Sequence, residues 1–421
     1  MSKHLIVIGG GAAGFFCAVN AVRLNPALKI TILEKSNKLL SKVKISGGGR
    51  CNVTHACFDI TEMSKQYPRG SNFVKKTFHQ FFTGDTIKWF EEREVKLKTE
   101  PDGRMFPVTD SSQTIIDCLM REANRFGVEI KMRAEVRSLK YEGEKFEVEL
   151  SDLRLMTSDF VCIACGGYSK PSMFDWLKNL GHSIEDPVPS LFTFNLPGHP
   201  ITKLMGVGVE NAKVKIQNAI AIGSKLNEEG PLLITHWGLS GPVILRLSAW
   251  GARQLAISNL SAGRQGWQFV ILINWLPLFT EQTLSDKFQS LRFEMASQKM
   301  KNRNPFGLPQ RLWEFLVDQS GIRAETRWAD LAAKDQNRLI KNLCGYELEV
   351  KGKTTFKEEF VTAGGIRLNE VDPNTMQSKL VPNLFFAGEI LDVDGITGGY
   401  NFQHAWTSGF IAAKSIAHLS S

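Results

Sequence analysis

The feature that most constrains this chain is the glycine pattern directly after its first apolar run. Residues 5–8 are continuously apolar, as in a strand that is buried on both faces of a sheet. Gly9, Gly11 and Gly14 follow in the spacing G-x-G-x-x-G. Gly9 permits a tight turn, Gly11 lets the backbone approach a pyrophosphate, and Gly14 lets the next helix pack closely on the sheet. This order predicts a strand, a phosphate-binding turn and a helix.

The residues after this turn complete a βαβ pattern. Ala12 and Ala13 begin a segment with apolar residues at helical spacing, and a second strand at 29–33 ends in Glu34 and Lys35. The N-terminus of a helix favours an anion such as a pyrophosphate, because its N–H groups are free and its dipole is positive there. A carboxylate at position 34 suits the hydroxyls of an adenosine ribose and disfavours a 2′-phosphate. We therefore expect NAD or FAD; the alternative is a tight turn without a ligand.

A second glycine cluster lies shortly after Glu34. Three consecutive glycines with flanking serine, arginine and asparagine can present N–H groups, a hydroxyl and a guanidinium to phosphates or to a flavin ring. The alternative is a flexible surface loop. The candidate cofactor contacts in this region are Lys42, Ser46, Gly47, Gly48, Gly49, Arg50, Cys51 and Asn52.

A third motif lies near the C-terminus, where the apolar run 384–387 leads into Gly388 and Glu389. A final helix is expected to start near Asn401, and its N-terminus would stabilise negative charge in the pyrimidine part of a reduced flavin. An NAD-binding domain needs no such distant element, whereas a flavin that bridges both ends of the chain does. We therefore expect FAD. The candidate contacts here are Gly388, Glu389, Asp394, Gly399, Asn401 and Phe402.

The residue pattern of the sequence changes in the middle of the chain. Short strands alternate with glycine and proline after about residue 188, and a polar stretch with helical spacing follows. We expect an insertion into a domain that is formed by both ends of the chain. The expected parts are 1–188 (first part of a Rossmann-like α/β domain), 189–275 (a β-rich, barrel-like insertion), 276–348 (a helical subdomain of the insertion) and 349–421 (second part of the α/β domain).

The composition excludes several classes of protein. Hydrophobic residues make up 43% and charged residues 22%, as in globular proteins. No apolar run reaches about 18 residues, so we expect no membrane insertion. The start of the chain lacks a secretory pattern, and the seven cysteines have irregular spacings, so we expect a cytoplasmic protein without a disulfide framework. The net charge of +8 is compatible with a nucleic-acid partner. Because the basic residues are spread along the chain, we expect a basic surface without one.

Five stretches are long or unusual enough to compare with known families. They are SGGGRCNVT at 46–54, THWGLSGP at 235–242, TAGGI at 362–366, TMQSKL at 375–380 and FAGEILDVDGITGGYNFQHAWTSG at 386–409. Together they resemble the BaiN/YhiN-like family of FAD-dependent oxidoreductases over essentially the whole chain. The resemblance implies an α/β fold with a glutathione-reductase-like FAD domain, interrupted by a β-barrel-like and a helical insertion.

The resemblance also implies roles for single residues. By position, the FAD contacts are Ala13 and Gly14 at the pyrophosphate, Glu34 at the ribose, Lys42 and the 47–52 loop, Val136 at the adenine, Glu389 at the ribityl or phosphate end, and Asn401 and Phe402 at the flavin ring. The segment ACGG at 164–167 is similar to the Ala-Thr-Gly-Gly turn of flavin domains, which adds Gly166.

The implied activity is hydride transfer from NAD(P)H through FAD to a small organic substrate of apolar or polycyclic character. One branch of the family is similar to enzymes that reduce double bonds in oxo-steroids. No second G-x-G-x-x-G follows a strand, so NADH or NADPH would bind transiently. Two alternatives stay open: an FAD-dependent RNA-modifying enzyme and a non-catalytic flavin-binding redox protein. The sequence indicates no oligomeric state.

Three residues are candidates for chemistry beyond the flavin. Cys51 lies in the glycine loop, and five residues separate it from Cys57. Two interpretations stay open: Cys51 forms a redox-active dithiol pair with Cys57, or it is a buried thiol without redox function. His404 and His236 lie in the family motifs and are candidate acids, although packing roles suit them equally. No cluster of Cys and His has the spacing of metal ligands, so no metal is expected.

Overall fold

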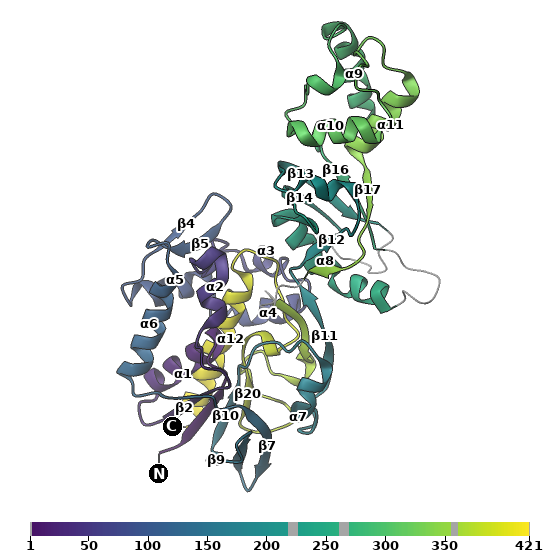
Figure 1. Cartoon of the computed structure of the whole chain (residues 1–421). Coiled ribbons are helices and arrows are strands. Elements are labelled where there is room, and N and C mark those ends of the chain that lie inside the picture. The colour runs from purple at the N-terminus through teal and green to yellow at the C-terminus, as the bar shows by residue number, and fades with distance from the viewer. Residues whose placement is uncertain (1, 218–225, 261–268, 355–360, 421) are drawn as a thin grey trace. The chain divides into compact units, whose positions relative to one another are not determined.

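A computed structural model describes residues 2–420 apart from 218–225, 261–268 and 355–360 (Figure 1). The chain forms two compact units. Unit 1 consists of Met1–Pro189 and Phe360–Ser421, and unit 2 consists of Ser190–Glu359. The chain returns to unit 1 at residue 360, later than the expected 349, because residues 346–354 still belong to the sheet of unit 2.

Unit 1 is built on a parallel five-stranded sheet. Its strands, in spatial order, are β20 (Leu384–Phe386), β10 (Phe160–Ile163), β1 (His4–Ile8), β2 (Lys29–Glu34) and β6 (Glu129–Met132). Ile8 is in register with Ile163 on one side and with Leu33 on the other. The residues that follow these strands therefore meet at the carboxyl edge, which is where ligands bind in open α/β sheets.

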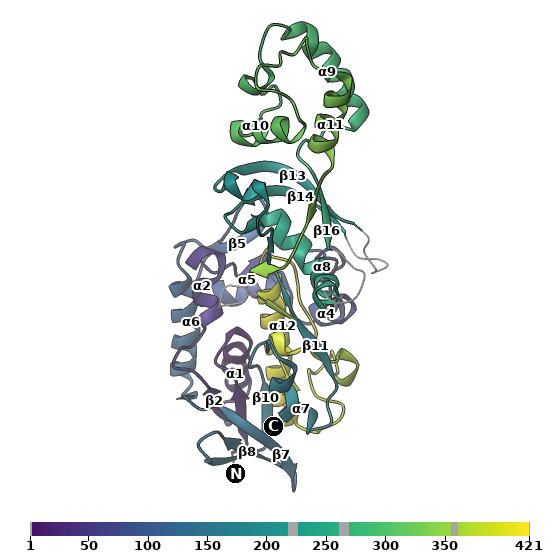
Figure 2. The same cartoon turned by 45° about the vertical axis from the view of Figure 1, so that its right-hand side comes forward.

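Two helices of unit 1 lie side by side against this sheet, α1 (Ala12–Leu24) and α12 (Tyr400–Leu419), as both views show (Figures 1 and 2). Gly409 permits their close approach, since a Cβ atom there would lie 2.7 Å from the carbonyl oxygen of Ala13. The N-terminal and C-terminal segments of the chain therefore form one body around the edge of the sheet.

The other elements of unit 1 surround this centre. They are α2 (Ser41–Gly49), α3 (Ile60–Ser64), α4 (Ser71–Phe78), α5 (Thr83–Glu91), α6 (Ser112–Arg125) and α7 (Asp175–Lys178), the sheet of β3 (Thr54–His55), β5 (Arg104–Pro107) and β4 (Leu97–Thr99), the sheet of β7 (Val136–Glu142), β8 (Lys145–Leu150) and β9 (Leu155–Ser158), and the pair β11 (Ile184–Ser190) and β19 (Val361–Ile366).

In its described residues, unit 2 contains an antiparallel seven-stranded sheet and four α-helices. The strands, in spatial order, are β17 (Tyr346–Glu349), β16 (Val270–Asn274), β13 (Gly208–Ile216), β14 (Asn227–Ile234), β15 (Gly238–Ser240), β12 (Thr193–Asn195) and β18 (Lys353–Thr354), and the helices are α8 (Pro242–Leu260), α9 (Glu281–Glu294), α10 (Gln310–Gln319) and α11 (Ala333–Cys344). Only three residues separate β17 from β18, although these strands pair with opposite ends of the sheet. The segment 346–354 thereby closes the sheet in a barrel-like manner.

One helical segment differs from the expectation. The long helix α8 lies in a region that we expected to be β-rich. Gly251 lets α8 approach the sheet closely, since a Cβ atom there would lie 2.7 Å from Cδ1 of Ile216. Within the described ranges, no helix combines the length and apolar character needed to cross a membrane.

Candidate functional site

The turn between β1 and α1 contains two glycines with no room for a side chain. Gly9 has a φ of +118°, and a Cβ atom there would lie 2.4 Å from the carbonyl oxygen of Ala164. A Cβ atom at Gly14 would lie 2.0 Å from the carbonyl oxygen of Gly9. At Gly11, by contrast, a Cβ atom would meet no described atom within 4 Å. The turn is packed on the protein side and open at Gly11, where the sequence predicts a pyrophosphate.

The helices α1 and α12 of unit 1 each follow a glycine, which has no side chain to cap the helix. Gly11 precedes α1 and Gly399 precedes α12, and neither first turn contains an acidic residue. The first N–H groups of an α-helix have no partner within the helix, and the helix dipole places partial positive charge there. Both helix ends are therefore suited to a negatively charged group.

Glu34 is held at the end of β2 by two backbone contacts. Its Oε2 atom accepts a hydrogen bond from the N–H group of Gly10 at 2.9 Å, and its Oε1 atom accepts one from Ser36 at 2.8 Å. Each carboxylate oxygen can accept a second hydrogen bond. The carboxylate is thus oriented beside the phosphate-binding turn with capacity for two hydroxyl groups.

The second glycine cluster forms the end of α2, which stops being helical at Ser46. Gly47 and Gly48 have φ values of +57° and +70°. A Cβ atom at Gly47 would lie 2.7 Å from the ring of Phe106, whereas one at Gly48 or Gly49 would meet no described atom within 4 Å. This loop is therefore pressed against Phe106 on one side and open on the other.

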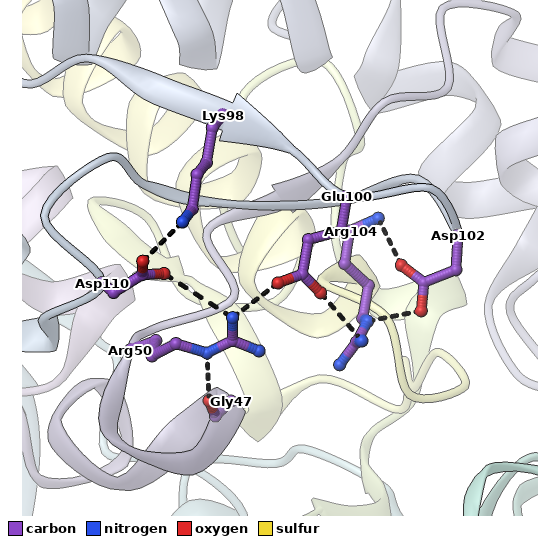
Figure 3. A network of polar contacts seen from close by, with 7 residues as sticks. All are labelled: Gly47, Arg50, Lys98, Glu100, Asp102, Arg104 and Asp110. Atoms are coloured by element: carbon purple, nitrogen blue, oxygen red, sulfur yellow. Dashed lines mark hydrogen bonds and ion pairs between the residues drawn. The ribbon is translucent and has the colours of Figure 1, made fainter.

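Arg50, a predicted cofactor contact, has several partners within the protein. Its Nη1 atom lies 2.5 Å from a carboxylate oxygen of Glu100 and 3.6 Å from one of Asp110, and its Nε atom donates to the carbonyl oxygen of Gly47 at 3.3 Å (Figure 3). The guanidinium lies 3.9 Å from the ring centre of Phe106. These contacts hold the half-buried guanidinium against the loop, and its contact with a cofactor stays a prediction.

Lys42 and Glu389 join the N-terminal and C-terminal parts of the site by an ion pair. Glu389 Oε1 also accepts a hydrogen bond from the N–H group of Thr362 at 2.8 Å. Gly388, with a φ of +75°, lies against Ala13, since a Cβ atom there would be 2.8 Å from that of Ala13. The carboxylate is therefore fixed beside the start of α1.

The polar side chains of Asp394 and Asn401, two predicted cofactor contacts, have partners within the protein. Both carboxylate oxygens of Asp394 pair with Arg69. The amide of Asn401 donates to the carbonyl oxygen of Gly395 and accepts from its N–H group, both at 2.9 Å. Phe402 is half-buried. Asp394 and Asn401 therefore shape the segment before α12, and the contacts of this segment with a cofactor stay a prediction.

His404 lies in a setting that does not suit an acid. It is buried, and its Nε2 atom lies 3.3 Å from the carbonyl oxygen of Gly388. Burial lowers the pKa of His404 to about 4. The imidazole is therefore neutral at neutral pH and donates its only proton to Gly388.

The other two chemical candidates are also placed by the structure. Cys51 is fully buried with a φ of +64°, and burial raises the pKa of its thiol to about 12. A protonated, inaccessible thiol is a poor nucleophile, so the dithiol interpretation is disfavoured. His236 is exposed in the turn between β14 and β15, with its ring centre 4.3 Å from that of Trp237. It belongs to unit 2 and is not among the residues that unit 1 brings together.

The expected adenine end is formed by residues near β2, β7 and β10. Lys35 Nζ lies 5.6 Å from the ring centre of Tyr168, within reach of a cation–π interaction. Gly166 has a φ of +77°, and Val136 is half-buried at the start of β7. These residues belong to one unit with the phosphate-binding turn, and their contact with an adenine stays a prediction.

Three residues beside the site were missed in the sequence. His55 contacts the carbonyl oxygen of Gly398, Tyr67 donates to the carbonyl oxygen of Tyr400 at 2.6 Å, and Arg69 pairs with Asp394. His55 directly follows the SGGGRCNVT stretch, which is a signal that could have identified it. Tyr67 and Arg69 carried no such signal.

The chain is similar over nearly its whole length to two named enzymes. The chain is 28% identical over 419 residues to a 3-dehydro-bile acid delta(4,6)-reductase of Clostridium scindens, and the match covers 98% of each of the two chains. It is 29% identical over 417 residues to a ribosomal RNA dihydrouridine synthase of Escherichia coli, covering 98% of this chain and 97% of the relative. Both relatives are named as enzymes, and the prediction that this chain is an enzyme is thereby confirmed.

A solved structure with the same fold is the 3-ketosteroid delta1-dehydrogenase of Sterolibacterium denitrificans. Its TM-score is 0.52 at 13% identity, and the match covers 99% of this chain and 100% of that one. The expected α/β, Rossmann-like fold class is thereby confirmed. The family of HI0933-like protein Rossmann domains matches residues 3–415. The chain therefore belongs to the HI0933-like family, as its resemblance to BaiN/YhiN-like proteins predicts.

Proposed function

We propose that unit 1 binds FAD and that the protein is an FAD-dependent reductase of carbon–carbon double bonds. The observation that carries the proposal is the pair of uncapped helix ends, α1 and α12, in one compact body. A ligand with a pyrophosphate at one end and an electron-accepting ring at the other suits two such positive ends. The open backbone at Gly11, Gly48 and Gly49 supports the same assignment.

The residues that would hold FAD follow from these positions. The N–H groups at the start of α1 would bind the pyrophosphate, Glu34 the ribose hydroxyls, and Lys42 and Glu389 the phosphate and ribityl region. The start of α12 would bind the pyrimidine edge of the ring. Bound FAD supplies the hydride carrier that the protein side chains lack.

The reaction class is supported by the names of the relatives. A delta(4,6)-reductase of 3-dehydro-bile acids and a dihydrouridine synthase both imply hydrogen added to a carbon–carbon double bond. In each implied substrate that double bond is conjugated with a carbonyl group, which prepares the distal carbon for hydride attack. We propose the same chemistry for this chain, with NADH or NADPH as a transiently bound reductant.

The charge distribution favours uridine in RNA over a small polycyclic substrate. Unit 2 contains 21 lysines and arginines against 15 acidic residues, whereas unit 1 contains 30 against 28. Exposed basic side chains of unit 2 include Arg303, Arg323, Arg327, Lys334 and Lys341. A basic surplus on one body attracts a polyanion such as RNA. We therefore propose RNA as the first substrate class, although the whole-chain charge had suggested a basic surface without such a partner.

The test uses the purified protein after anaerobic reduction with NADH or NADPH. We expect an rRNA fragment that contains uridine to restore the oxidised flavin spectrum and to gain two hydrogens, as read by mass spectrometry. A 3-oxo-Δ4,6 bile acid is the competing substrate, and its saturated analogue is the control. Reoxidation by the bile acid alone would contradict the RNA assignment, and reoxidation by neither would contradict the proposed reaction class.

A further inference from the structure

The peptide group between Gly398 and Gly399 is held by two side chains, those of His55 and Asn52, which follow the second glycine cluster in the chain. The Nδ1 atom of His55 lies 3.0 Å from the carbonyl oxygen of Gly398. A carbonyl oxygen can only accept, so Nδ1 carries the proton. At the other end, the N–H group of Gly399 donates to the side-chain oxygen of Asn52 at 3.0 Å, in the amide orientation that also lets Asn52 donate to Thr54. One peptide group thus has both of its polar atoms fixed.

The orientation of this peptide depends on those partners more than on its own backbone. Gly398 and Gly399 have φ values of +138° and +96°, in the region that glycine enters freely. Neither glycine carries a Cβ atom, so local backbone sterics alone do not select one orientation of the peptide. The peptide directly precedes the first turn of α12, whose N–H groups are uncapped. Its orientation therefore determines which polar atoms lie beside that helix end.

The imidazole of His55 is itself held in a fixed position. Its ring stacks on that of Tyr400, with centres 4.8 Å apart and planes 22° apart. On the side of its Nε2 atom lies Gly103, where a Cβ atom would come within 2.5 Å of Nε2. His55 also pairs with Arg104 in the register of β3 and β5. Only a glycine at position 103 leaves room for this ring.

Ion pairs connect the β4–β5 hairpin, which contains Gly103, with Arg50 of the glycine loop. Arg104 contacts Glu100 at 2.9 Å and Asp102 at 2.7 Å, and Glu100 in turn contacts Arg50 (Figure 3). Burial lowers the pKa of His55, with the charges of Asp102 and Arg104 opposing each other. The ring is thus a neutral donor at neutral pH.

We propose that His55 and Asn52 are positioning residues that lock the Gly398–Gly399 peptide and thereby raise the reduction potential of the flavin. Released from His55, the carbonyl oxygen of Gly398 can turn toward the N–H groups of Asn401 and Phe402 in the first turn of α12. It then competes with the negative charge of the reduced ring for those groups. The inference rests on the proposed FAD site.

The test compares the midpoint potential of bound FAD in wild type, His55→Ala, His55→Asn and Asn52→Ala at pH 7, with melting temperatures of the same samples. We expect His55→Ala and Asn52→Ala to lower the preference for reduced over oxidised flavin about tenfold, or about 30 mV for two electrons. His55→Asn places an amide N–H the same number of bonds from Cβ as Nδ1, so it should restore the wild-type potential. The exposed His79 supplies the control His79→Ala, which should change nothing.

The outcomes distinguish a failure of the positioning role of His55 and Asn52 from a failure of the proposed FAD-binding function. A wild-type protein that binds no FAD would contradict the proposed function. If His55→Ala and Asn52→Ala bind FAD and keep the wild-type midpoint potential, the positioning role is contradicted and the proposed FAD site is not. If His55→Ala fails to fold, Asn52→Ala decides the matter, because it frees the other end of the same peptide.

Discussion

Lys42 and Glu389 form an ion pair although 347 positions separate them in the chain. The Lys42 side chain is 49% exposed and that of Glu389 18% exposed, so the pair contributes at most about 1 kcal/mol to folding. A charge beside a pyrophosphate is worth more to binding, about 1.5–3 kcal/mol. The pair therefore matters more for the cofactor than for the fold.

We predict that Lys42→Met weakens FAD binding about tenfold or more, since 1.4 kcal/mol is a factor of ten. The free energy of unfolding without FAD should change by less than about 1 kcal/mol. Fluorescence titration of the flavin-free protein measures the first and urea unfolding the second. Lys65→Met, which breaks the exposed pair with Glu62, is the matched control. Equal FAD affinity in both variants would contradict the role of Lys42.

Two glycine substitutions should separate binding from stability. Gly14→Ala places a methyl group 2.0 Å from a carbonyl oxygen and should destabilise the protein by more than about 2 kcal/mol. Gly11→Ala meets no described atom within 4 Å, so the flavin-free protein should keep its melting temperature and lose FAD. Thermal unfolding and the flavin-to-protein ratio test both. Normal FAD content in Gly11→Ala would show that no phosphate lies there.

Cys51 should be chemically inert in the folded protein. Its thiol is buried with a pKa of about 12, so iodoacetamide at pH 8 should leave it unmodified while the half-buried Cys57 reacts slowly. Peptide mass spectrometry reads the labelling. Cys51→Ala should keep flavin reduction within about twofold of wild type. Rapid labelling, or lost reduction with full FAD content, would restore the dithiol interpretation.

His404 should make the protein sensitive to acid. Its pKa is about 4 when folded and about 6.5 when unfolded, so the unfolded chain binds the proton first. Its contribution to stability is complete above pH 6.5 and falls as the pH drops from 6.5 to 4. Between pH 7 and 4.5, wild type should lose about 2 kcal/mol more than His404→Gln, by urea unfolding of the flavin-free protein. Exposed His418 supplies the control His418→Gln. Identical acid losses in wild type and His404→Gln would contradict this assignment.

The parts of the fold that local sequence determines could be predicted residue by residue. The order of β1, the glycine turn, α1 and β2 follows from glycine spacing and apolar runs, and Glu34 follows from its place after a strand. Helix α8 could not be predicted in the same way. Its valine, isoleucine and glycine residues resemble a strand pattern. Gly251 packs closely against Ile216, a contact between distant residues that spacing along the chain does not reveal.

The partners of charged side chains were beyond sequence reasoning. Arg50 and Asp394 lie in the predicted cofactor motifs, yet their partners Glu100 and Arg69 lie 50 and 325 positions away. Spacing along the chain identifies which backbone approaches a ligand. It does not identify which side chain a buried charge meets, because that depends on how distant elements pack.

The most direct test of the central claim is the flavin content of the wild-type protein and of Glu34→Ala after gel filtration. We predict that wild type elutes with about one FAD per chain and a yellow absorbance. Glu34→Ala should elute with most of the FAD lost and with its secondary structure retained by circular dichroism, while the exposed control Glu62→Ala keeps its flavin. Full yellow absorbance in Glu34→Ala, or a wild-type protein that takes up no FAD, would contradict the account.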